Sequence, residues 1–192
     1  MKSFELENAR AHFCISSLWE STFSIFCGRT TVFQDELREG RRGLDLIGVT
    51  VEMHNPIDLM IIMLGTNDCK TRYRASASVI AKGLDQVIRK ARQNASRHFD
   101  LLVISPIHLG VGVGDADFDP EFDAASVAVS RNLANEYRKI ALQNHAAFLN
   151  ASDFAAPSVT DREHMDEKGH AALADAIYNK ILALQKGLSH VI

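Results

Sequence analysis

The chain has 192 residues, of which 46% are hydrophobic and 23% are charged, and its net charge is −3. These values are ordinary for a globular protein, and we expect residues 1–192 to form a single domain. The slightly acidic balance argues against a nucleic-acid surface. No segment has the pattern of a membrane span or a signal peptide, so we expect a cytoplasmic protein without membrane contact.

Short apolar runs alternate with amphipathic segments along the chain. We expect strands at 22–27, 59–64, 101–105 and 146–150, and helices at 42–48, 75–95, 125–144 and 167–184. The run at 59–64, bounded by Pro56 and Gly65, is typical of a strand buried on both faces of a parallel sheet. Strands that alternate with helices predict parallel βαβ units, and therefore an α/β fold with a three-layer α/β/α sandwich.

A polar turn, Gly65-Thr66-Asn67-Asp68, follows the strand at 59–64. Ligands of open α/β sheets bind outside the carboxyl ends of strands, so this turn lies where chemistry usually takes place. The Asn67 side chain could donate an N–H group to a developing oxyanion. The same residue types also form good turns, and the local sequence leaves both interpretations open.

The second motif is Asp161-Arg162-Glu163-His164, just before the closing helix. An Asp three residues before a His can bond the ring nitrogen, fix the tautomer and stabilise the imidazolium that forms when the His acts as a base. The pair gains weight because the strand-end Asn67 precedes it in the chain.

Together with Gly28-Arg29-Thr30-Thr31, these motifs resemble those of the SGNH hydrolases, also called the GDSL esterase/lipase family, and especially its arylesterase-like branch. The resemblance covers about residues 24–186 and implies a flavodoxin-like parallel sheet. It also implies roles for four residues: Gly28 and Asn67 would form the oxyanion hole, His164 would be the general base, and Asp161 would orient it.

The resemblance implies a carboxylic ester hydrolase that acts on small acyl esters through a serine acyl-enzyme. It implies a small-molecule ester as partner, no metal and no cofactor. The branch includes oligomers, so it also allows a homo-oligomer. Thr30 and Asp68 lie beside the oxyanion residues, and we assign them as substrate contacts, although each could instead hold its own turn.

The nucleophile motif of the family, Gly-Asp-Ser, is absent from this chain. The nearest match is Ser16-Ser17-Leu18, in which Ser17 would be the nucleophile. Only ten residues separate Ser17 from Gly28, too few for a helix and a second strand. We therefore expect residues 1–23 to be atypical and the first βα unit to be incomplete. The alternative function is a catalytically inactive or truncated relative that lacks the serine nucleophile.

Two further features carry weaker signals. Gly110-Val111-Gly112-Val113-Gly114 departs from a phosphate-binding loop because Asp115 stands at the sixth position. Asp115, Asp117 and Asp119 alternate as in a calcium loop, but Pro120 replaces the required Gly. We interpret this segment as an acidic, mobile surface loop, and the family resemblance implies that it borders the substrate site.

The three cysteines show no metal-ligand spacing, which predicts reduced thiols. We interpret Cys69, beside the Asn67 turn, as structural, because a catalytic thiol needs a nearby base.

Overall fold

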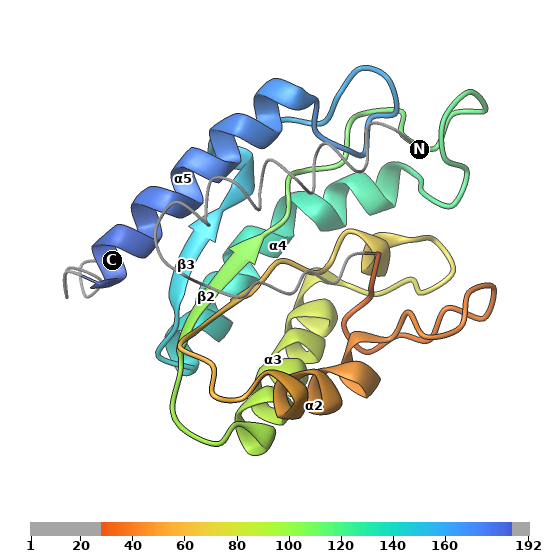
Figure 1. Cartoon of the computed structure of the whole chain (residues 1–192). Coiled ribbons are helices and arrows are strands. Elements are labelled where there is room, and N and C mark those ends of the chain that lie inside the picture. The colour runs from red at the N-terminus through yellow and green to blue at the C-terminus, as the bar shows by residue number, and fades with distance from the viewer. Residues whose placement is uncertain (1–27, 186–192) are drawn as a thin grey trace.

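The computed structural model describes residues 28–185 and has a parallel sheet with helices on both faces (Figure 1). The elements in chain order are α2 (Gly43–His54), β1 (Leu59–Ile62), the 3-10 turn η1 (Asn67–Cys69), α3 (Ala77–Asn94), β2 (Asp100–Ser105), α4 (Ala124–Gln143), β3 (Ala147–Asn150), the 3-10 turn η2 (Ala151–Asp153) and α5 (Glu167–Gln185). The predicted strand at 22–27 lies outside the described residues.

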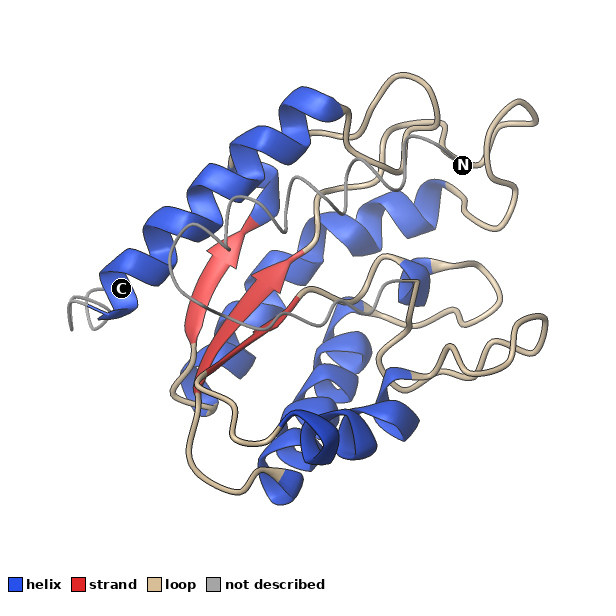
Figure 2. Cartoon of the chain, in the orientation of Figure 1, coloured by secondary structure: helices blue, strands red, loops and turns tan. Residues whose placement is uncertain are grey.

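The described strands pair in the order β1-β2-β3, and both pairings are parallel. Parallel neighbours need a long crossover, which α3 supplies between β1 and β2 and α4 supplies between β2 and β3. The carboxyl ends of the three strands therefore meet at one edge of the sheet, where the loops that follow them gather (Figure 2).

The central strand β2 shows why the fold has three layers. Successive side chains of a strand point to opposite faces. Leu101 and Val103 belong to a core cluster with residues of α2, α3 and α4, whereas Leu102 and Ile104 belong to a second cluster with Leu173 of α5. Each face of the sheet is thus covered by helices, and the predicted three-layer α/β fold is confirmed.

Two predicted details were wrong. The run at 59–64 was expected to be buried on both faces, but Ile62 is the only buried residue of β1, and the strand that is buried on both faces is β2, in which only Asp100 is exposed. The reason is that β1 lies at an edge of the described sheet, where flanking helices cover less. The helix predicted at 42–48 is α2, which continues past Gly48 to His54. Gly48 lets α2 pack closely on α3, since an added Cβ would lie 3.2 Å from Lys90 Cε.

No helix in residues 28–185 is both long and apolar enough to cross a membrane.

Candidate active site

The end of β1 is fixed by a buried tyrosine. Gly65 has a φ of +127°, a backbone conformation that residues with side chains rarely adopt, and an added Cβ would lie 2.5 Å from Tyr137 Oη. That hydroxyl, on the fully buried Tyr137 of α4, donates a hydrogen bond of 2.9 Å to Leu64 O. The chain can therefore turn sharply at Gly65 and begin η1 at Asn67.

Asp68 joins η1 to the segment that carries Gly28. Its carboxylate accepts hydrogen bonds from Thr31 N at 2.8 Å and from Thr31 Oγ1 at 2.5 Å, and both residues are completely buried. Burial raises the pKa of Asp68 to about 6, although the bonds from Thr31 act in the opposite direction. These bonds hold two segments that are 37 residues apart in the sequence.

The Thr31–Asp68 pairing also brings the Asn67 side chain to the segment that carries Gly28. Asn67 Nδ2 donates a long hydrogen bond, of 3.5 Å, to the carbonyl oxygen of Arg29, the residue after Gly28. Gly28 is exposed and has a φ of +67°, and an added Cβ would lie 2.6 Å from Arg41 Nη1. A residue with a side chain would be strained at this position, so the local backbone requires glycine.

The predicted substrate contacts of Thr30 and Asp68 stay predictions. Thr30 is 2% exposed, and its hydroxyl donates to Phe33 O at 2.5 Å. Both side chains are buried and hydrogen-bonded within the turns, which favours the alternative that they hold the turns.

Asp161 and His164 form a hydrogen-bonded pair in the loop between β3 and α5. His164 Nδ1 lies 2.9 Å from Asp161 Oδ2, and the imidazole side chain is 72% exposed. Because Asp161 accepts from a protonated Nδ1, the other ring nitrogen of a neutral His164 is left as the basic atom. The pair therefore has the geometry of a general base with its orienting carboxylate.

The backbone around Asp161 keeps its carboxylate ionised. Partial burial raises the pKa of Asp161, but hydrogen bonds from the N–H groups of Glu163 and His164, from the His164 ring and from the Ser158 hydroxyl lower it by more. Oδ1 accepts from the two N–H groups at 2.9 Å and from Ser158 Oγ at 3.0 Å. An ionised Asp161 can stabilise a protonated His164.

Sequence reasoning missed two neighbours of this pair. Ser158 belongs to a Ser-x-x-Asp pattern that could have suggested its bond to Asp161. Glu163 is mostly buried, its carboxylate lies 4.0 Å from His164 Nδ1, and burial raises its pKa despite the opposing effect of His164. The only signal in the sequence that Glu163 lies near the His164 ring was that it directly precedes His164.

The loop after β2 connects the two parts of the site. Gly110 N donates to Arg162 O at 2.7 Å, within the Asp161–His164 turn, and Thr71 N donates to Glu121 O at 2.8 Å, just after η1. The loop predicted to border the substrate site thus contacts both the segment just after η1 and the Asp161–His164 turn.

Charged side chains reinforce the contact between this loop and η1. Glu121 pairs with Lys70, Arg72 and Arg38, and Arg72 also pairs with Asp35 at 2.9 Å. Burial lowers the pKa of Lys70, and its ammonium is nearly inaccessible to solvent. Each carboxylate of this cluster contacts more than one cation, and the cluster therefore fixes the loop after β2 against the segment that follows η1.

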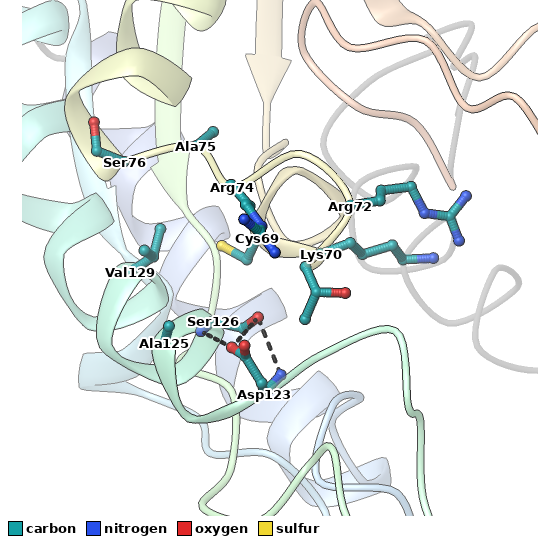
Figure 3. Close-up of a pocket in the computed structure, with 11 residues that line it drawn as sticks. Cys69, Lys70, Arg72, Arg74, Ala75, Ser76, Asp123, Ala125, Ser126 and Val129 are labelled. Atoms are coloured by element: carbon teal, nitrogen blue, oxygen red, sulfur yellow. Dashed lines mark hydrogen bonds between the residues drawn. The ribbon is translucent and has the colours of Figure 1, made fainter.

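A cavity of about 790 Å³ lies beside η1, between the segment that leads into α3 and the start of α4 (Figure 3). It is lined by Cys69, Lys70, Thr71, Arg72, Arg74, Ala75, Ser76, Asp123, Ala125, Ser126 and Val129. Asn67, Asp161 and His164 are not among these residues, so the cavity is a neighbour of the candidate site.

Cys69, at the wall of this cavity, has the character expected of a structural thiol. Its Sγ donates to Gly65 O at 3.3 Å, and burial, followed by the charge of Asp68, raises its pKa to about 12. Cys14 and Cys27 lie outside the described residues. Within residues 28–185, no group of three His, Cys, Asp or Glu side chains could hold a metal ion.

Comparison with known proteins identifies the family and the fold of the chain. Residues 20–172 match the family described as GDSL-like lipase/acylhydrolase. One crystal structure is 36% identical, covers 85% of this chain and 75% of its own, and has a TM-score of 0.76. Est24, a carbohydrate acetylesterase from Sinorhizobium meliloti, is 26% identical, with coverages of 83% and 76% and a TM-score of 0.75.

The native aryl esterase of M. smegmatis has the same fold, with 23% identity, coverages of 89% and 81%, and a TM-score of 0.79. No curated protein matches the chain. The family match spans most of the sequence, and the chain therefore belongs to the GDSL-like lipase/acylhydrolase family. It is thus an SGNH hydrolase, a class of carboxylic ester hydrolases. Ser17, the predicted nucleophile, lies outside the described residues.

Proposed function

We propose that the chain is a serine esterase that hydrolyses small acyl esters through an acyl-enzyme. The observation that carries the proposal is the hydrogen-bonded Asp161–His164 pair, at the same sheet edge as the Asn67 turn. Est24, which is a carbohydrate acetylesterase, supports acetyl-sized acyl groups. The proposal requires no cofactor.

In the proposed first step, the Ser17 hydroxyl attacks the ester carbonyl while the unbonded ring nitrogen of His164 accepts its proton. The carbonyl oxygen becomes an oxyanion, to which Gly28 N–H and the Asn67 amide donate. The alkoxide then leaves with the proton returned by His164. Water repeats the sequence on the acyl-enzyme and releases the carboxylic acid. Asp161 holds the His164 ring throughout.

The second candidate is an inactive relative that keeps the fold and lacks the nucleophile. The observation in its favour is the absence of Gly-Asp-Ser from the chain. This candidate function predicts a folded protein without turnover on any small ester, in which the only role of Asn67 is to stabilise its turn.

Two substitutions of Asn67 separate an oxyanion role from a turn role. Asp is nearly isosteric with Asn and also suits turns, but it donates no N–H group and carries a charge. If Asn67 is an oxyanion donor, both Asn67→Ala and Asn67→Asp should lower kcat on 4-nitrophenyl acetate by about 10²–10³-fold. Asn132→Ala, an exposed position on α4, is the control.

The turn interpretation predicts a different pattern. Asn67→Asp would then keep kcat close to the wild-type value, and only Asn67→Ala would show a defect, together with a lower melting temperature. That pattern in a wild-type protein with measurable turnover would overturn the oxyanion assignment. A wild-type protein that is folded but has no turnover on acetyl esters would instead support the inactive relative.

A further inference from the structure

Arg162 occupies an unusual backbone position inside the Asp161–His164 turn. Its φ is +61°, in the left-handed region that residues with side chains rarely adopt. Its N–H donates to Ser158 O at 3.0 Å, and its carbonyl accepts from Gly110 N at 2.7 Å. Both peptide groups of the residue are thus held, one within the turn and one by the loop after β2.

The Arg162 side chain leaves the turn and lies across that loop. Nη1 donates to Val111 O at 2.9 Å and lies 3.1 Å from Asp115 Oδ2. The guanidinium carbon lies 4.1 Å from the ring centroid of Phe118, a cation–π distance. Three different groups of one loop therefore contact a side chain whose own backbone lies between Asp161 and His164.

The glycines of this loop are what allow the contact. A Cβ on Gly110 would lie 2.8 Å from Arg162 Cβ, and a Cβ on Gly112 would lie 2.1 Å from Arg162 Nη1. Gly114 has a different neighbour, since its Cβ would meet Phe122 O at 2.1 Å. Two of the three glycines that resembled a phosphate-binding loop thus make room for Arg162.

We propose that Arg162 is a positioning residue, and that its contacts with Gly110, Val111, Asp115 and Phe118 hold the Asp161–His164 pair in its productive geometry. Asp161 and His164 lie on either side of Arg162 in a short exposed turn. A turn with one residue in the left-handed region has other conformations available, and the anchored side chain excludes those that separate the carboxylate from the imidazole. The kinetic part of this proposal rests on the proposed esterase function.

The first test measures the His164 tautomer and needs no turnover. Two-bond proton–nitrogen correlation spectra of the neutral ring show which nitrogen carries the proton. The wild type should carry it on Nδ1, bonded to Asp161. Arg162→Gly removes the side chain, while glycine adopts the positive φ without strain, and should shift the ring toward a mixture with the Nε2–H form.

Arg74→Gly is the matched control. Arg74 also has a positive φ, of +46°. This substitution changes the same residue type in the same backbone region, and the His164 tautomer should stay as in the wild type. Asp115→Asn removes the negative charge from one contact on the exposed loop side without altering the turn, and should shift the tautomer in the same direction by less than Arg162→Gly.

The kinetic test separates positioning from general stability. Displacing a catalytic group by a small distance can cost about 10²-fold in rate, so Arg162→Gly should lower kcat by about 10–100-fold and leave KM nearly unchanged. Arg162→Lys should recover part of the loss, because it keeps the charge near Asp115 but loses the planar contact with Phe118.

The outcomes distinguish this inference from the proposed function. An unchanged Nδ1–H tautomer in folded Arg162→Gly and Asp115→Asn proteins would overturn the positioning role and leave the Asp161–His164 pair intact. A wild-type ring that carries its proton on Nε2 would overturn the pair itself, and the inference with it.

Discussion

The sharpest structural prediction concerns Gly65, where β1 turns into the Asn67 segment. Gly65→Ala would place a Cβ 2.5 Å from Tyr137 Oη, at a φ of +127°. The backbone strain costs about 1–3 kcal/mol. Displacing the hydroxyl from Leu64 O leaves a buried polar group without its partner, which costs about 1–3 kcal/mol more. We therefore expect the free energy of unfolding to fall by about 2–6 kcal/mol in urea titrations followed by circular dichroism.

The Tyr137→Phe background tests whether the contact with the hydroxyl is the cause. Phenylalanine lacks the oxygen that the new Cβ would meet, so Gly65→Ala should cost less in Tyr137→Phe than in the wild type. A double-mutant cycle then gives the coupling between the two positions. Equal costs of Gly65→Ala in the two backgrounds, or a cost below about 1 kcal/mol in the wild type, would refute the reasoning.

Two other predictions concern ionisation. Burial raises the pKa of Asp68 from the usual 3.8 to about 6, so the folded state binds this proton more tightly than the unfolded state, and stability falls as the pH rises through that window. Relative to Asp68→Asn, the wild type should lose about 3 kcal/mol of unfolding free energy between these two pH values. Urea titrations at several pH values measure this loss. If the unfolding free energies of the two proteins changed equally with pH, the burial argument would be contradicted. The Cys69 thiol, with its pKa raised to about 12, should resist iodoacetamide in the native protein and react on unfolding, as followed by peptide mapping; rapid native labelling would show that the thiol is accessible.

The fold could be predicted largely because its signals are local. The apolar run of β2 and the periodic apolar positions of α3 and α4 lie within single elements, and the observed ends differ from the predicted ones by one or two residues. The main errors, the partial burial of β1 and the length of α2, depend on neighbours in space. The edge position of β1 and the close helix–helix contact at Gly48 cannot be predicted from the sequences of these two segments alone.

The contacts of the site also fall into local ones, which the sequence predicts, and long-range ones, which it does not. The Asp161–His164 bond spans three residues, and a short motif was enough to predict it. The bonds of Thr31 to Asp68 and of Arg162 to the loop after β2 join residues 37 and 51 apart, and they depend on how the loops approach one another at the sheet edge. The glycines at 110 and 112 indicated a special loop, but only the approach of Arg162 explains them.

The central claim is that this chain uses a serine nucleophile with His164. Labelling the purified, folded protein with a fluorophosphonate probe, followed by peptide mass spectrometry, tests it most directly. The account predicts a stoichiometric adduct on Ser17 that is lost in His164→Ala, because the base is needed to activate the hydroxyl. An adduct on a different serine would keep the enzyme and refute Ser17. The absence of any adduct would contradict the claim and leave an inactive relative that retains the esterase fold.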